Sequence, residues 1–205
     1  MSMDILTKEM VIGAGWDPSN TNKDVDIDLF AVAVIDQMEK VKTGFLKREL
    51  KPTGKKEIVT CYYGNKSPTE LNRGLVLDED NRTGEDRESL LTVNGRKDDE
   101  QIHLNLDKLP ESCSRVYVGL DFYNAGSRTF KDVNNIYTRL HVDGEEMFVA
   151  NIDNNPEKDN AKSIHYLTFR KEDGEWSVEF VGDFLNINGI KYVRNHMTAG
   201  KNYLK

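Results

Sequence analysis

In the segment from Lys23 to Val34, aspartates alternate with apolar residues in the first half and the residues are apolar in the second half. A period of two is the side-chain spacing along a β-strand. Every second residue from Asp24 onward therefore lies on one face of the predicted strand. In order, the residues on that face are Asp24, Asp26, Asp28, Phe30, Val32 and Val34. The pattern predicts a strand that leaves the core beside Phe30 and ends at the edge of the domain with its carboxylates clustered.

Carboxylates gathered on one strand face must be solvated or neutralised. Same-face neighbours lie about 7 Å apart, whereas two oxygens bound to one Ca²⁺ are at most about 5 Å apart. Two explanations are open: a solvated strand end, or a cation site completed by another segment. An EF-hand loop is excluded, because Leu29 replaces its glycine and Ile35 its bidentate glutamate.

The remainder of the chain predicts an all-β fold. Short alternating segments are joined by turn sequences, including Asp-Gly pairs at 143–144 and 173–174 that are typical of two-residue hairpins. We therefore expect an antiparallel β-sandwich with short helical segments in its connections, forming a single domain over residues 1–205 with a core at about 10–185. Two surface insertions are expected, at about 38–56, where a short helix over 46–51 is one option, and at about 86–97 in a long acidic loop.

Composition limits the function. The net charge of −7 argues against a general binder of nucleic acid or anionic membranes. No apolar run approaches the roughly 20 residues of a membrane span, and no signal peptide is recognised, so we expect a cytoplasmic protein. The P-loop, GxGxxG, GxSxG and HExxH motifs are absent and the four histidines have no ligand spacing, so we expect a protein that is not an enzyme.

Acidic segments in the long loop complement the strand carboxylates. They are Asp80 with Asn81, and Asp98, Asp99 and Glu100. Hard divalent cations bind oxygen ligands, and Ca²⁺ takes six to eight of them from carboxylates, amides and backbone carbonyls. These acidic segments contain no Cys or His, which disfavours soft metals there.

Several segments together resemble the TerD family of tellurium-resistance proteins. Residues 11–34 resemble its opening, with Gly-Trp-Asp followed by a strand that begins Asp-x-Asp. Residues 79–85 resemble the family's G-D-N-x-T-G-x loop, and residues 98–100 its D-D-E segment. Residues 115–140 resemble its next strand, turn and R-x-F region. The likeness covers residues 10–185 in consistent order.

The resemblance implies a non-enzymatic β-sandwich that binds one or two Ca²⁺ ions and is linked to tellurite resistance, stress response and phage defence, with possible protein partners in a stress-response complex. It implies the metal ligands Asp26, Asp28, Asp80, Asn81, Thr83, Asp98, Asp99 and Glu100, with Asp24 a weaker candidate. Residues 86–97 interrupt the family's loop, and Glu79 replaces a glycine. The alternative is therefore a TerD-like interaction or scaffold module whose metal site is partly degenerate.

Overall fold

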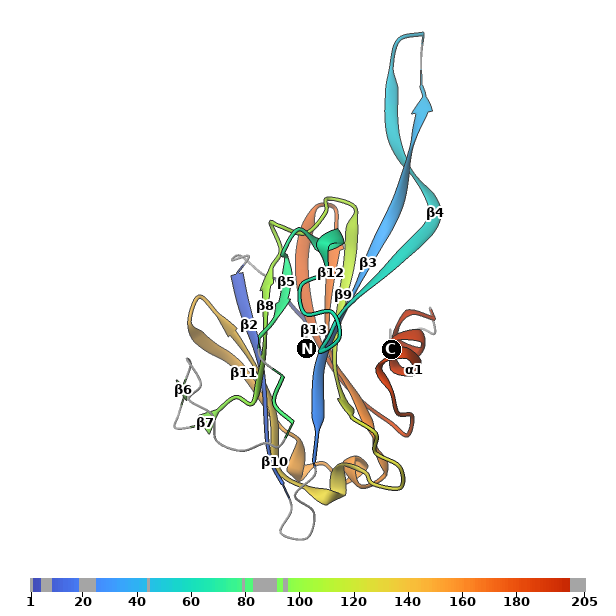
Figure 1. Cartoon of the computed structure of the whole chain (residues 1–205). Coiled ribbons are helices and arrows are strands. Elements are labelled where there is room, and N and C mark those ends of the chain that lie inside the picture. Colours follow the sequence, from blue (N-terminus) through green and yellow to red (C-terminus); the bar gives the residue numbers. More distant parts are fainter. Residues whose placement is uncertain are drawn as a thin grey trace.

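Two antiparallel sheets pack face to face in the computed structural model (Figure 1). The structure describes residues 2–4, 9–18, 25–43, 45–78, 80–82, 92–93 and 96–199. The first sheet has the strand order β1-β13-β12-β9-β3-β4 and the second the order β11-β10-β2-β8-β5. This arrangement confirms the predicted all-β sandwich.

The strands of the first sheet are β1 (Ser2–Asp4), β13 (Glu175–Leu185), β12 (Ser163–Glu172), β9 (Cys113–Phe122), β3 (Ile27–Lys42) and β4 (Arg48–Cys61). Those of the second sheet are β11 (Glu145–Asn151), β10 (Val133–Val142), β2 (Glu9–Pro18), β8 (Glu100–Asn105) and β5 (Leu75–Leu77). A separate pair is formed by β6 (Thr92–Val93) and β7 (Arg96–Lys97). The helical segments are η1 (Thr69–Leu71), η2 (Phe130–Asp132), η3 (Ile152–Asn154), η4 (Pro156–Asn160) and α1 (Ile190–Thr198).

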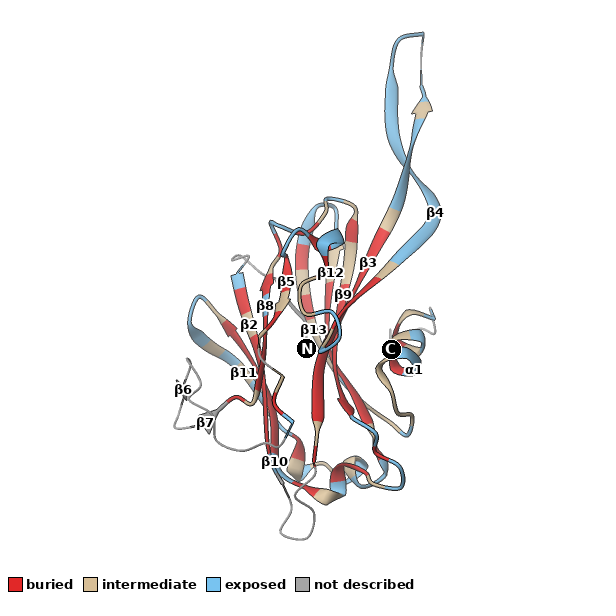
Figure 2. Ribbon diagram, viewed as in Figure 1, coloured by how far each residue is buried: buried red, intermediate tan, exposed pale blue. Residues whose placement is uncertain are grey.

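Strand β3 is buried on both faces along its first half (Figure 2). Ile27, Leu29 and Ala31 pack into the core between the sheets. Phe30 and Val32 point to the opposite side of the first sheet. There they contact α1, so the predicted apolar face of this strand is covered by the C-terminal helix.

Helix α1 presents Val193 and Met197, both fully buried, to this second apolar cluster. Their spacing of four residues places them on one side of the helix. Tyr192, on another side, is exposed. None of the helices in the described ranges has the length and apolar character of a membrane span.

Both predicted Asp-Gly hairpins are confirmed. Asp143 and Gly144 have φ values of 51° and 80°, and Asp173 and Gly174 have 51° and 88°. Positive φ at both central residues is the requirement of a type I′ turn, whose twist matches that of the strands it joins.

The predicted insertion at 38–56 is a protruding β-hairpin, and the short helix over 46–51 was wrong. Strands β3 and β4 remain paired beyond the core as far as Lys42 and Arg48, and the Thr43 amide donates to the Lys47 carbonyl at 3.0 Å. Figure 1 shows this ribbon extending away from both sheets. Cross-strand pairing on both sides of the register shift between Asp36 and Met38 supplies backbone hydrogen bonds that a short exposed helix would lack. Of the predicted insertion at 86–97, only β6 and β7 belong to the described residues.

Candidate metal site

Two of the predicted carboxylates lie at the start of β3. Asp28 is 2% exposed and projects from the same face as Phe30. Asp26 precedes the strand, and its carbonyl accepts a hydrogen bond from the Tyr123 amide at 2.9 Å. That contact places Asp26 beside the loop that follows β9.

Asp80 joins these two side chains from the segment that follows β5. One carboxylate oxygen from each of Asp26, Asp28 and Asp80 lies within 4.8 Å of the others. We call these three residues the acidic cluster. The cluster lines a cavity of about 130 Å³ together with Tyr63, Arg82 and Tyr123.

Two carboxylate oxygens of the acidic cluster are buried without a hydrogen-bond donor among the described residues. They are Oδ1 of Asp26 and Oδ2 of Asp28. A buried carboxylate oxygen is costly unless a donor, a proton or a cation compensates it. The only ion pair reaching the cluster in the described ranges joins the exposed Arg82 Nε to Asp80 Oδ2 at 3.3 Å.

Burial and mutual repulsion favour protonation of these groups. Burial, and then the charge of Asp80, raises the pKa of Asp26 to about 6. Burial, followed by the charges of Asp26 and Asp121, raises the pKa of Asp28 to about 8. A cation bound between them would oppose both causes, because it stabilises the ionised carboxylates.

Glu100 fastens the acidic loop to β3. Its Oε2 accepts the Leu29 amide at 2.7 Å, and its Oε1 accepts the Asn81 amide at 3.3 Å. Burial raises the pKa of Glu100 well above its ordinary value, and the Leu29 hydrogen bond acts in the opposite direction. These two bonds place Asp28 and Asp80 near each other, since each is adjacent in sequence to one of the donors.

Asp99 and Asn81 hold the same loop against β2. Asp99 Oδ2 accepts the Trp16 amide at 2.8 Å, and its Oδ1 accepts Nδ2 of Asn81 at 2.7 Å. One oxygen of Asp99 therefore holds the backbone of β2 and the other holds the side chain of Asn81, next to Asp80 in the sequence.

Asp98 points to a different part of the molecule. Its Oδ1 lies 2.7 Å from Nε of the buried Arg139 and accepts the Tyr137 hydroxyl at 3.2 Å, while Oδ2 accepts Gln101 Nε2 at 2.7 Å. Gly13 leaves space for this carboxylate, since a Cβ there would lie 2.2 Å from Asp98 Oδ2. The structure therefore gives Asp98 a buried ion pair and does not bring it to the acidic cluster.

The sequence did not predict the aromatic lining or the role of Asp121. Tyr63 and Tyr123 meet edge to face, with centroids 5.6 Å apart. Asp121 pairs with Asp28 across the β3–β9 ladder and accepts the Ser163 hydroxyl and the Gly189 amide. Its place on the same face of β9 as Tyr117 follows from the sequence spacing, but its position beside Asp28 required the strand pairing. Thr83 and Asp24 lie outside the described residues.

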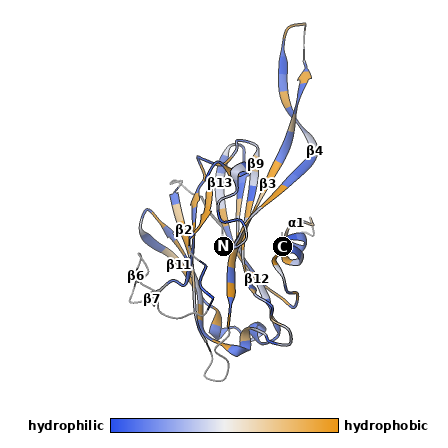
Figure 3. Ribbon diagram, viewed as in Figure 1, coloured by the Kyte–Doolittle hydropathy of each residue, from blue (hydrophilic) through white to orange (hydrophobic). Residues whose placement is uncertain are grey.

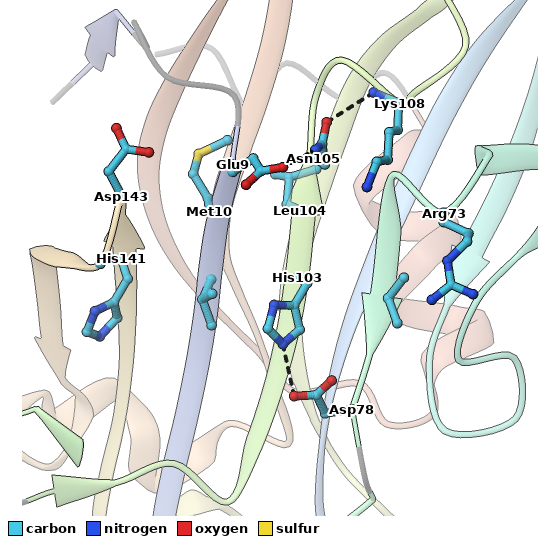
Figure 4. A pocket seen from close by; sticks show the side chains of 13 residues that line it. Glu9, Met10, Arg73, Asp78, His103, Leu104, Asn105, Lys108, His141 and Asp143 are labelled. Carbon is cyan, nitrogen blue, oxygen red and sulfur yellow. Dashed lines mark hydrogen bonds and ion pairs between the residues drawn. The ribbon is translucent and has the colours of Figure 1, made fainter. Parts of the chain in front are cut away.

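A second, larger cavity of about 580 Å³ lies on the outer face of the second sheet and shares no lining residue with the acidic cluster (Figure 4). Its lining mixes acids and bases: His103 Nε2 lies 2.9 Å from Asp78 Oδ2, and Arg73 and Lys108 border the same space. This mixture does not provide the converging oxygens that a hard cation requires.

The fold and the acidic cluster together define this protein as an antiparallel β-sandwich with carboxylates gathered at the start of one central strand. The TerD domain model matches residues 3–192, so the chain belongs to the TerD family. It is 25% identical over 177 residues to the tellurium resistance protein TerD of Serratia marcescens, covering 85% of this chain and 80% of that protein. It is 24% identical over 180 residues to the uncharacterized protein YceE of Bacillus subtilis, covering 86% and 81%.

Solved structures share the fold. A homologue of telluride resistance protein TerD, SCO6318 from Streptomyces coelicolor, superposes with a TM-score of 0.66 at 18% identity, over 91% of this chain and 95% of that one. The protein of unknown function SAV2460 superposes with a TM-score of 0.65 at 18% identity, over 92% and 95%.

Proposed function

We propose that this TerD-family protein binds Ca²⁺ at the acidic cluster and acts without enzymatic activity in a tellurite-resistance or stress response, including phage defence. The observation that carries the metal proposal is the convergence of three carboxylates, two of which have a buried oxygen without a donor in the described part of the chain. The link to tellurite resistance is proposed from the names of the TerD relatives in Serratia marcescens and Alcaligenes. The wider stress response and phage defence are proposed from the family resemblance alone.

The donor set is suited to a hard cation. Asp26, Asp28 and Asp80 would supply carboxylate oxygens, and backbone carbonyls or waters would complete the six to eight ligands that Ca²⁺ takes. Glu100 and Asp99 would act through the backbone amides that they hold. The described residues that line the cavity include no His or Cys, which disfavours soft metals.

Thermal unfolding tests the metal proposal. A cation that binds only the folded state at 100 times its Kd adds about 2.7 kcal/mol to the free energy of unfolding. For a chain of this size, that corresponds to a rise in Tm of about 5–10 °C. The melt is compared in millimolar CaCl₂, in MgCl₂ and in EDTA. Equal Tm values in CaCl₂ and EDTA would exclude Ca²⁺ binding at the cluster.

A second candidate function is a protein-interaction or scaffold module with a degenerate metal site. The observation that favours it is that Asp98 and Asp99 are occupied by Arg139 and by Trp16 with Asn81, which leaves fewer carboxylates for a metal than the family resemblance implies. A stable partner recovered equally in Ca²⁺ and in EDTA, together with an unchanged Tm, would support this alternative.

A further inference from the structure

The β3–β4 hairpin exposes two large apolar side chains at its end. We call residues 36–57 the arm. Phe45 is 92% exposed and Leu46 is 93% exposed. Lys42 Nζ lies 5.9 Å from the centroid of the Phe45 ring. An exposed apolar pair at the end of a protruding ribbon is unusual on a surface that contacts only water.

The register of the arm separates its charges onto two faces. Residues that pair across antiparallel strands share a face, and successive residues alternate. Beyond the register shift at Asp36, the first face carries three cations and no acid, from the pairs Met38↔Pro52, Lys40↔Leu50 and Lys42↔Arg48. Asp36, at the base of the arm, forms an ion pair with Lys56 at 3.3 Å. The opposite face carries two glutamates and one lysine, from the pairs Glu39↔Lys51 and Val41↔Glu49.

The first face is apolar as well as basic. Met38 is 41% exposed and Leu50 is 61% exposed, so aliphatic side chains alternate there with cationic ones. Figure 3 shows the corresponding alternation of polar and apolar residues along the arm. Side chains of Lys and Arg can lay their apolar stems along such a surface and extend their charges beyond it.

The charge of the arm is opposite to that of the whole chain. Residues 36–57 contain seven Lys or Arg and four Asp or Glu, although the chain has a net charge of −7. The seven strand residues from Asp36 to Lys42 extend about 20 Å at the rise of a β-strand. This length exceeds the Debye length of about 8 Å at physiological salt, so the acidic body only weakly opposes an anionic surface at the end of the arm.

The edges of the arm are protected against strand pairing. The register shifts between Asp36 and Met38, and Pro52, at this shift, has no amide to donate. Lysines line the remaining ladder. A second copy of the chain adding to this edge is therefore disfavoured, and the tip and the basic face are the available surfaces.

We propose that the arm docks on anionic lipid bilayers, with Phe45 and Leu46 inserted among the headgroups and the face carrying Lys40, Lys42 and Arg48 lying against lipid phosphates. A bilayer offers both an apolar boundary and a negative surface potential, which matches this combination of residues. Nucleic acid would leave Met38, Leu46 and Leu50 without a function, because aliphatic side chains do not stack on bases as aromatic ones do.

Vesicle flotation tests this proposal with the full chain. Vesicles of phosphatidylcholine alone are compared with vesicles that also contain phosphatidylserine, in EDTA and in CaCl₂. We expect binding only to the anionic vesicles and binding that persists in EDTA, because the acidic cluster lies at the other end of β3 from the tip. This readout is therefore independent of the proposed Ca²⁺ function.

Variants locate the contact. The double variant Lys40→Gln, Lys42→Gln should weaken partitioning about 25-fold, at about fivefold or roughly 1 kcal/mol for each cation removed. The matched control is Lys131→Gln, Lys191→Gln, which removes the same charge from exposed positions on the body.

Substitutions at the tip test insertion. Phe45→Ser, Leu46→Ser should abolish insertion. Phe45→Trp should bind as the parent does and show a blue-shifted emission on anionic vesicles, since Trp16 and Trp176 are already buried.

Three results would overturn the proposal. The first is no binding to anionic vesicles. The second is a loss of binding in Lys131→Gln, Lys191→Gln as large as in Lys40→Gln, Lys42→Gln, and the third is a Phe45→Trp emission that does not change on vesicles that bind the chain. Light scattering after size exclusion completes the test. A dimer that Phe45→Ser, Leu46→Ser dissociates, without vesicle binding, would assign the tip to self-association instead.

Discussion

Replacing Asp28 by Asn should stabilise the metal-free protein and remove its response to Ca²⁺. Asp28 is 2% exposed, and its Oδ2 has no donor among the described residues. A pKa raised from 3.8 to about 8 corresponds to a preference for the neutral carboxyl on the order of 6 kcal/mol. Asn is neutral at every pH, so the variant avoids this cost.

The sign of the pH dependence follows from proton linkage. Between pH 3.8 and about 8, folded Asp28 binds more protons than unfolded Asp28, so the metal-free free energy of unfolding falls as the pH rises through this range. Below pH 3.8 the carboxyl is neutral in both states and nothing is lost. The gain from Asp28→Asn should therefore be small at pH 4 and largest at pH 8.

The repulsion is shared among the three carboxylates of the acidic cluster, and the surrounding structure relaxes around a charged group. We therefore expect Asp28→Asn to raise the free energy of unfolding by only about 2 kcal/mol at pH 8. This gain raises Tm by about 4–8 °C for a chain of this size. The assay is a thermal melt in EDTA from pH 4 to 8, repeated with CaCl₂. The exposed turn residue Asp173 supplies the control Asp173→Asn, which should change neither series.

Two results would refute the argument. A lower metal-free Tm for Asp28→Asn at pH 8 would mean that the carboxylate is compensated in the folded protein. A full Ca²⁺ response in the variant would mean that the metal binds elsewhere.

Three further predictions concern positions around the site and the outer helix. Asp98→Ala should destabilise the fold by about 3–5 kcal/mol, because it leaves Arg139 as a buried charge without its closest carboxylate. The rise in Tm on adding Ca²⁺ should be retained. If the folded variant no longer gains Tm from Ca²⁺, Asp98 is a metal ligand. Gly13→Ala should cost about 1–3 kcal/mol in chemical denaturation, since its Cβ would overlap the Asp98 carboxylate; an unchanged midpoint would contradict this packing. Met197→Ala should lower the free energy of unfolding by about 2–5 kcal/mol, whereas Tyr192→Ala, at an exposed position, should lower it by less than about 0.5 kcal/mol. Equal effects of the two substitutions would contradict the packing of α1 on the first sheet.

The fold was accessible from the sequence where local signals coincide. Period-two alternation and Asp-Gly turns each depend on neighbouring residues alone, so the strands around Asp143 and Asp173 were predicted with their connections. The arm was not predicted. Its strands alternate lysine with apolar residues and bury no face, so the hydrophobic pattern that identifies a strand is weak there.

The candidate site was accessible in part. The convergence of Asp28 with Asp80 was expected from the family resemblance. The separation of Asp98 from Asp99 was missed, although successive residues of an extended chain point to opposite sides. Tyr63 and Asp121 were missed because their proximity to Asp28 depends on which strands pair, and strand pairing is not encoded in local spacing.

The position of β3 also affects how the molecule folds. Its partners are distant in sequence, as the pairing of Ile27 with Phe122 shows, and Glu100 fastens its beginning to a third distant segment. Contacts of such high sequence separation slow folding, because loop closure precedes any gain from them. If the carboxylates meet only after the rate-limiting step, protonating them will slow unfolding and leave the refolding rate nearly unchanged. Stopped-flow measurements in EDTA at pH 5 and pH 8 would then give different unfolding rates and the same refolding rate. The pH dependence of the acidic cluster would therefore show which contacts form late in folding.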